Sequence, residues 1–283
     1  MKNRKILITG ASGFIGKNLT EQLSKEYLIF APTTYELNLL NQFEVEKYLN
    51  DYKIDVIIHC ANYRGKIGEP YSGSKVLETG LRMYSNLERC SHLYDKMLYF
   101  GSGAEYDSRH YQPFMKEDYF GRHIPQDGYG FYKYLISKQC TQKDNIYDLR
   151  LFGVYGKYED WTRRFISNNI CRALKDKPMT LSRNVYFDYI YIDDLAKVFY
   201  QLIDKDVYNE TVNLGSGRGY SVNDILAFLK IITKKDFKIV YENARPMDVS
   251  NMVLDTEKMQ RLAQVELTPM LDGISTFYNE SVK

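Results

Sequence analysis

The chain has 283 residues, 44% of them hydrophobic, enough to bury a full core as one large domain or as a domain with a smaller lobe. Its 38 basic and 36 acidic residues give a net charge of +2, which offers no electrostatic footprint for nucleic acid. No apolar run approaches the roughly 18 residues that a membrane span needs, and the first residues pass directly into a strand-like run. We therefore expect a cytoplasmic protein without a signal peptide or a membrane partner. The four cysteines show no metal or redox spacing, so no metal site is expected.

A glycine-rich segment follows the first strand-like run. Residues 5–9 are apolar and β-branched, residues 10–16 read Gly-Ala-Ser-Gly-Phe-Ile-Gly, and Leu19 and Leu23 then have helical spacing. A strand, a glycine turn and a helix in this order are the context of a dinucleotide fingerprint. The glycines allow close backbone approach, and the helix N-terminus faces the pyrophosphate. The spacing G-x-x-G-x-x-G differs from the commoner G-x-G-x-x-G, and a glycine turn that binds nothing is the alternative.

Strand-like and helical runs then alternate along the chain. The expected strands are residues 27–31, 54–59, 97–100 and 147–152, and the expected helices are residues 43–49, 81–90 and 132–140. This alternation predicts an α/β fold with a doubly wound parallel (Rossmann) sheet and helices on both faces. Ligands of such sheets lie beyond the carboxyl ends of the strands. Gly10 and Ser102 each follow a strand, so both are expected at one crevice.

The regular alternation of strand-like and helical runs ends at Gly156. Helices are expected over residues 161–174, 194–203 and 221–232, and strands over residues 185–192 and 211–214, the last of which could return to the sheet. We predict a dinucleotide-binding domain over residues 1–156, with residues 189–215 returning to it. Residues 157–188 and 216–283 would form a smaller, interleaved C-terminal α/β lobe that binds the substrate at the junction.

Tyr129 and Lys133 stand four residues apart in a helical run that follows Ser102. This spacing places both on one helix face. A cation beside the phenol lowers its pKa from a free value near ~10, which makes the pair an acid and base for a carbonyl under reduction. Tyr134 and Lys138 have the same spacing and are the second possibility.

Together these motifs resemble the extended short-chain dehydrogenase/reductase family of NAD(P)-dependent nucleotide-sugar enzymes, which holds epimerases, dehydratases and GDP-fucose synthases. The similarity runs nearly from end to end. It is carried by residues 10–16, 55–61, 100–106, 129–133, 151–156, 188–194, 213–216 and 245–248. The set is specific to the superfamily and only weakly specific for a substrate.

The resemblance implies a role for each matching residue. The catalytic set would be Ser102, Tyr129 and Lys133, with Tyr129 preferred over Tyr134 because the family has a Tyr-Gly dipeptide at the start of this helix. The cofactor would be bound by Gly10, Ser12, Gly13, Phe14, Ile15, Gly16, Thr33, Asn38, Leu39, Cys60, Ala61, Tyr129, Lys133, Phe152 and Val154. Arg164 and Arg245 would bind the diphosphate of a nucleotide-diphosphate sugar, and the protein would be a homodimer.

Departures from the family narrow the chemistry. Gly103 and Ala104 stand where the dehydratases have an Asp-Glu pair, and neither can move a proton. The GDP-fucose synthases epimerise with a Cys and a His, whose positions fall here at Ala104 and near Arg164. The prediction is therefore an oxidoreductase that uses NAD(P)H to reduce a keto group, with C4 favoured, of a nucleotide-linked keto-deoxy sugar. One alternative is an NAD-dependent nucleotide-sugar 4-epimerase, and the other is a non-catalytic NAD(P)-binding regulator, which the intact catalytic set disfavours.

The residues after the second strand bear on the cofactor. NAD enzymes usually place an acid there for the ribose hydroxyls, and NADP enzymes favour an Arg. Here Thr33, Thr34 and Tyr35 follow the strand, with Glu36 beyond. The absence of an acid directly at the strand end, together with two hydroxyl donors, favours NADP(H) slightly over NAD(H).

Overall fold

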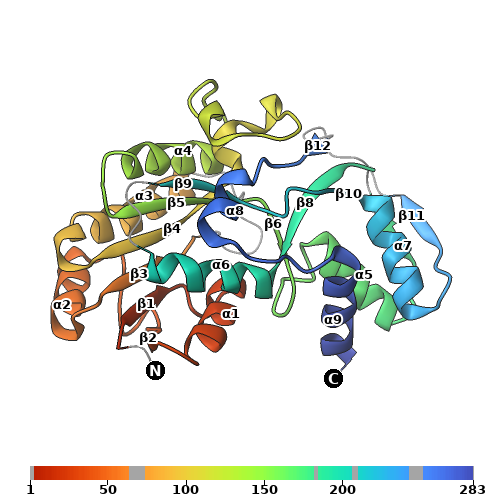
Figure 1. Ribbon diagram of the computed structural model, residues 1–283, viewed down its shortest axis with the longest axis horizontal. Helices are drawn as coiled ribbons and strands as arrows, with labels where there is room; N and C mark the ends of the chain where they lie inside the picture. The colour runs from red at the N-terminus through yellow and green to blue at the C-terminus, as the bar shows by residue number, and fades with distance from the viewer. Residues whose placement is uncertain (1–2, 64–73, 182–183, 206–209, 242–250, 283) are drawn as a thin grey trace.

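A six-stranded parallel sheet forms the centre of the molecule (Figure 1). The computed structural model describes residues 3–63, 74–181, 184–205, 210–241 and 251–282. The strand order is β2-β1-β3-β4-β5-β9, and every neighbouring pair is parallel. The strands are β1 (Lys5–Thr9), β2 (Leu28–Phe30), β3 (Val56–His59), β4 (Lys96–Ser102), β5 (Ile146–Leu151) and β9 (Thr211–Leu214). The predicted doubly wound sheet is confirmed, and the strand at residues 211–214 does return to it.

Helices cover both faces of this sheet (Figure 1). One face carries α2 (Gln42–Tyr52), α3 (Ser74–Glu88) and α4 (Gly128–Cys140), and the other carries α1 (Phe14–Leu23) and α6 (Ile192–Asp204). Successive strand residues point to opposite faces. Leu7 and Tyr99 accordingly pack with the first set of helices, whereas Ile8 and Phe100 pack with the second.

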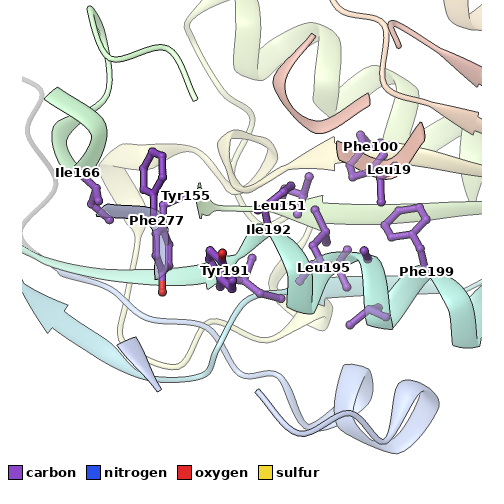
Figure 2. Close-up of a cluster of buried hydrophobic side chains, with 14 of the residues drawn as sticks. Leu19, Phe100, Leu151, Tyr155, Ile166, Tyr191, Ile192, Leu195, Phe199 and Phe277 are labelled. Atoms are coloured by element: carbon purple, nitrogen blue, oxygen red, sulfur yellow. The ribbon is translucent and has the colours of Figure 1, made fainter. Parts of the chain in front are cut away.

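The core on the α6 face is apolar and continues into the second lobe (Figure 2). Phe199 stacks on Phe100 with ring centroids 5.1 Å apart, and Leu195 and Ile192 follow along α6. The same cluster reaches Phe277, which belongs to the C-terminal helix. The two parts of the chain therefore share one hydrophobic core.

The second lobe is built from short strands and four helices in the described part of the chain. β8 (Tyr186–Tyr191) pairs with β6 (Gly153–Tyr155), β10 (Gly219–Ser221) and β12 (Asn251–Met252), and β7 (Met179–Leu181) pairs with β11 (Ile239–Tyr241). The helices are α5 (Phe165–Leu174), α7 (Val222–Thr233), α8 (Glu257–Ala263) and α9 (Met270–Val282). Between β3 and α4, the described residues form four short 3₁₀ helices: η1 (Ser91–Leu93), η2 (Gly103–Tyr106), η3 (Ser108–His110) and η4 (Glu117–Tyr119). The residue boundaries proposed for the two domains stay a prediction.

The helix expected from Trp161 begins later, at Phe165. Asp160 Oδ1 accepts hydrogen bonds from both the backbone N–H (3.0 Å) and the hydroxyl (2.6 Å) of Thr162. This local turn holds residues 161–163 outside the helix. Among the described residues, no helix combines the length and the apolar character of a membrane span.

Candidate functional site

The glycine turn after β1 is tight enough to require its glycines. Gly10 has φ +68°, and a Cβ there would lie 2.7 Å from the Cα of Ala61. A Cβ on Gly16 would lie 2.3 Å from the carbonyl oxygen of Gly10. The Gly10 carbonyl also accepts the N–H of Gly13, the N-cap of α1, at 3.0 Å. The glycines thus allow the backbone to turn tightly at the N-terminus of α1, and a helix N-terminus preceded by such a turn suits a pyrophosphate.

The remaining residues predicted around this turn lie beside it. Ser12 is exposed, whereas Phe14 and Ile15 are half-buried against the core. Cys60 and Ala61 follow β3, and the N–H of Ala61 donates to Thr9 Oγ1 at 3.3 Å. The ends of β1 and β3 are therefore tied together under the turn.

The segment after β2 places an acid where the sequence suggested none. The carboxylate of Glu36 folds back and accepts the backbone N–H and the hydroxyl of Thr33, at 2.7 and 2.9 Å. These hydrogen bonds lower the pKa of Glu36. Thr34 remains exposed, Asn38 Oδ1 accepts the N–H of Leu40, and Leu39 is buried. Thr33 is thus committed to Glu36, and Thr34 presents the second hydroxyl of the pair to solvent.

Ser102 and Tyr129 come from neighbouring turns. Ser102 ends β4 and caps η2, where its Oγ accepts the N–H of Ala104 at 3.2 Å. Tyr129 lies in the first turn of α4, which begins because Asp127 accepts the N–H of Gly130 at 2.8 Å. The two turns touch, since a Cβ on Gly130 would lie 2.8 Å from the carbonyl oxygen of Ala104.

Lys133 lies one helical turn after Tyr129 and is buried. Its ammonium donates to the carbonyl oxygen of Phe100 at 2.5 Å and lies 4.5 Å from the ring centroid of Tyr99. Burial lowers the pKa of Lys133 to about 8, against the opposing charge of Glu105. Lys133 is thus held against β4, two residues before Ser102.

Two aromatic residues surround the loop after Ser102. The ring of Phe152 covers Gly103, where a Cβ would approach it to 2.3 Å. The hydroxyl of Tyr111 donates to the carbonyl oxygen of Gly103 at 2.6 Å, and Tyr129 is among the groups that act on its pKa. Tyr111 is a site neighbour that the sequence did not single out. Val154, in contrast, lies in β6 and pairs with Ile190 of β8.

A second set of buried charges lies directly below the candidate catalytic residues and was missed from the sequence. Arg150 Nε donates to Glu105 Oε2 at 2.8 Å and to Asp148 Oδ2 at 2.9 Å. All three side chains are almost fully buried. The available signal was the charged pair Asp148 and Arg150, which alternates with apolar residues inside one predicted strand.

The predicted substrate residues lie in the second lobe or beyond the described chain. Arg164 is exposed at the N-cap of α5. Its charge acts on Glu159, whose pKa burial raises to about 7 and whose Oε2 is buried without a hydrogen-bond partner. Arg245 lies outside the described residues.

Two surface cavities of the described chain lie away from Ser102. One, of about 430 Å³, is lined by Lys197, Tyr200 and Glu266, far from the glycine turn in sequence and on the outer side of α6. The other, of about 560 Å³, lies beside the end of β2 and includes Pro32 and Glu36. Only the second adjoins residues predicted to bind the cofactor.

The chain is similar to known proteins over nearly its whole length. Over 96% of each chain, the protein is 24% identical to GDP-L-colitose synthase from Yersinia pseudotuberculosis. The fold matches GDP-mannoheptose C4 reductase from Campylobacter jejuni with NADP bound, with a TM-score of 0.83, 22% identity and coverage of 100% of this chain and 99% of that one. It also matches UDP-glucose 4-epimerase from Thermotoga maritima, with a TM-score of 0.85, 21% identity and coverage of 99% and 100%.

The family model described as "NAD dependent epimerase/dehydratase family" matches residues 6–215, which include the glycine turn, Ser102, Tyr129 and Lys133. The resemblance inferred from the sequence motifs is thereby confirmed. The chain belongs to the NAD dependent epimerase/dehydratase family.

Proposed function

We propose that this NAD(P)-dependent enzyme reduces the C4 keto group of a nucleotide-linked keto-deoxy sugar. The observation that carries the proposal is the contact between the Ser102 turn and the Tyr129 turn, with Lys133 buried behind them. The names of similar proteins, GDP-L-colitose synthase and GDP-mannoheptose C4 reductase, support a reduction of this kind.

The chain's own residues have separate roles in this reaction. A bound nicotinamide dinucleotide would supply the hydride, and the tight glycine turn of Gly10 and Gly16, at the N-terminus of α1, would hold its pyrophosphate. Ser102 Oγ accepts from Ala104, so its own hydrogen can be donated to the substrate carbonyl. As the hydride adds to carbon, the carbonyl oxygen takes a proton from the Tyr129 hydroxyl, and the phenolate later regains one from solvent.

Lys133 would support Tyr129 from the same helix face. Its ammonium is held at the carbonyl oxygen of Phe100, two residues before Ser102 in β4. The positive charge favours the phenolate that remains on Tyr129 after proton transfer. Gly103 and Ala104 carry no group that moves a proton, and the ring of Phe152 fills the space above Gly103. Reduction therefore fits these residues better than dehydration does.

A 4-epimerase is the second candidate function. It would use the same three residues, and the similarity in fold to UDP-glucose 4-epimerase favours it. An epimerase retains its NAD and needs no added reductant, whereas a reductase consumes its cofactor. Mass spectrometry of the purified protein for tightly bound NAD separates the two.

NADP(H) is the cofactor that we propose, and Thr34 is the residue that supports it. The hydroxyl of Thr33 is taken by Glu36, so exposed Thr34 is the hydroxyl left to meet a 2′-phosphate. The nearby carboxylate of Glu36 opposes a phosphate by charge repulsion, so the preference should be modest.

Arg245, helped by Arg164, is proposed to bind the substrate diphosphate. Arg164 stands at the N-terminus of α5, where the helix dipole also favours an anion. A homodimer and a cytoplasmic location stay predictions from the sequence.

The proposal is tested by following NADPH absorbance with a panel of GDP-, CDP- and dTDP-linked 4-keto-6-deoxy sugars. We expect one of them to be reduced at C4 with one NADPH consumed per product. Interconversion of 4-hydroxy epimers without NADPH consumption would instead establish the epimerase.

A further inference from the structure

The proposed mechanism leaves a buried charged cluster unused. We define the Arg150 cluster as Glu105, Asp148 and Arg150, whose side chains are 0%, 0% and 1% exposed. Buried charges are costly unless they are paired, and such groups often support a site. The cluster lies at the carboxyl end of β4 and β5, beneath Ser102 and Lys133.

Glu105 connects this cluster to Ser102. Its Oε1 accepts the backbone N–H of Ser102 at 2.7 Å, while its Oε2 accepts Nε of Arg150 at 2.8 Å. In return, the Ser102 side chain accepts the backbone N–H of Glu105, so the two residues form a reciprocal capping box at the start of η2. The direction of the Ser102 side chain therefore depends on the carboxylate of Glu105.

The cluster also fills the space that a side chain would need at Gly101 of β4. A Cβ on Gly101 would lie 2.1 Å from Asp148 Oδ1 and 2.7 Å from Glu105 Oε1. Two carboxyl groups thus pack directly against the strand backbone, and only glycine leaves them room. This arrangement brings the negative charges to the end of β4, which carries Ser102 and accepts the hydrogen bond of Lys133.

Arg150 fixes Glu105 in position. Its guanidinium donates to Tyr106 Oη at 2.7 Å and to Ser137 Oγ at 2.8 Å, besides the two carboxylates. Ser137 in turn donates to Asp148 Oδ2 at 2.5 Å. All three nitrogens of the guanidinium donate hydrogen bonds, so the side chain of Arg150 is fixed. Glu105 can then satisfy both of its carboxylate oxygens in one arrangement only.

The same carboxylate lies near Lys133. Lys133 Nζ donates to the carbonyl oxygen of Phe100, and Glu105 Oε1 lies against the next residue of β4, Gly101. Burial lowers the pKa of the Lys133 ammonium, and Glu105 and then Asp148 are the main charges that oppose this effect. Burial, and then Asp148, raises the pKa of Glu105, while Arg150 acts against the rise. Both oxygens of Glu105 accept N–H donors, which is the pattern of an ionised carboxylate. The other titratable groups whose interaction with Lys133 bears on their pKa values or its own are His59, Cys60 and Cys140.

We propose that Glu105 is a positioning residue: its carboxylate, clamped by Arg150, orients Ser102 through the backbone N–H and keeps Lys133 in its charged form. The inference rests on the proposed function for its catalytic consequence. Its structural consequence, the charge on Lys133, is independent of the substrate.

The test compares Glu105→Gln with Glu117→Gln. Glu117 is a matched control because its Oε1 also accepts a backbone N–H, that of Asn213, at 2.9 Å, and it is absent from the main charges that act on Lys133. The protein is labelled with ¹³C at the lysine ε-carbons, and the Lys133 signal is assigned with Lys133→Met. Glu105→Gln should shift the titration of Lys133 to lower pH by on the order of 1 pH unit, because an attracting charge is lost, and Glu117→Gln should leave it in place.

A kinetic measurement completes the test. Glu105→Gln should lower kcat on the order of 10- to 100-fold, because Ser102 loses its orientation and Lys133 loses an attracting charge. KM should change little, because the variant removes no proposed contact with the substrate. An unchanged Lys133 titration, or an unchanged kcat, in folded Glu105→Gln protein would overturn the proposal. If Glu105→Gln does not fold, Asp148→Asn replaces it, and it should shift the Lys133 titration in the same direction. If the native protein reduces no keto sugar, the proposed function fails, while the titration still decides the role of Glu105.

Discussion

The apolar cluster on the α6 face and the Arg150 cluster are equally buried, but different forces hold them. Phe199 is 0% exposed and is held by ring stacking and non-directional contacts. Arg150 is 1% exposed and is held by directed hydrogen bonds to two carboxylates and two hydroxyls. Phe100 lies in the apolar cluster and also contacts the candidate site, since its ring stacks on Phe199 while its carbonyl oxygen accepts from Lys133. The apolar region stabilises the fold, and the charged region fixes the geometry of the candidate site.

The largest expected effect lies at the polar end of this comparison. Tyr129→Phe removes the proposed proton donor and should lower turnover on the order of 10²–10⁴-fold without changing thermal stability. Tyr134→Phe is the control, because Tyr134 is buried, stacks on Phe120 at 4.8 Å and has the same spacing to a lysine. Steady-state rates and melting curves of both variants check this. A near-native rate for Tyr129→Phe would remove Tyr129 from its role.

The second prediction compares a substitution to methionine in the Arg150 cluster with a substitution to methionine in the apolar cluster. Arg150→Met leaves two buried carboxylates without their cation and should cost about 3–5 kcal/mol of unfolding free energy. Leu195→Met in the apolar cluster conserves volume and should cost less than about 1.5 kcal/mol. Urea unfolding measures both. Equal costs would contradict the contrast between the two regions.

The third prediction concerns the pH dependence of stability that arises from His59, a buried polar residue at the end of β3. His59 Nδ1 lies 2.7 Å from Thr9 Oγ1, and burial lowers its pKa from 6.5 to about 3. Between these values the unfolded chain binds more protons than the folded one. The free energy of unfolding should therefore fall as pH falls, by about 1.4 kcal/mol per pH unit from this group.

His59→Asn should lose this contribution, so the stability advantage of the native protein over the variant should shrink from pH 6.5 towards pH 4. Urea unfolding of both proteins across this range gives the difference directly, and other groups that titrate in it cancel. A constant difference would mean that His59 is already protonated in the fold.

The smallest expected effect is at the surface, where charges are screened. Thr34→Asp places a carboxylate beside the proposed 2′-phosphate and should lower the NADPH-to-NADH ratio of kcat/KM about fivefold, since a charge pair at 4 Å in water is worth about 1 kcal/mol. Glu36→Gln removes a carboxylate there and should raise the ratio. A ratio that rises in Thr34→Asp or falls in Glu36→Gln, or that stays unchanged in both variants, would show that the phosphate binds elsewhere.

Local patterns explain which parts of the molecule could be predicted. Patterns over consecutive residues predict the strands at residues 5–9 and 147–152 and the glycine turn. The predicted fold and family are confirmed. Ser102, Tyr129 and Lys133 came from motif spacing, and the structure brings their turns together. Their catalytic roles stay a prediction.

The features that were missed depend on tertiary contacts. Glu105 and Arg150 are 45 residues apart and meet only because β4 and β5 pair in a particular register. The fold-back of Glu36 onto Thr33 depends on the turn that follows β2, and it changed the interpretation of the cofactor site. Short strands such as β12, of two residues, carry too little pattern to be predicted from sequence.

The most direct test of the central claim is the transfer of deuterium from the nicotinamide to the sugar. NADPH deuterated at the transferring position of its C4 carbon is incubated with the native enzyme and the keto sugar that the panel identifies, and the product is examined by NMR. The account predicts one deuterium at C4 of the sugar for each NADPH consumed, and far slower formation of the same product by Tyr129→Phe. A product whose C4 carries no deuterium, or a 4-hydroxy sugar epimerised without consumption of NADPH, would contradict it.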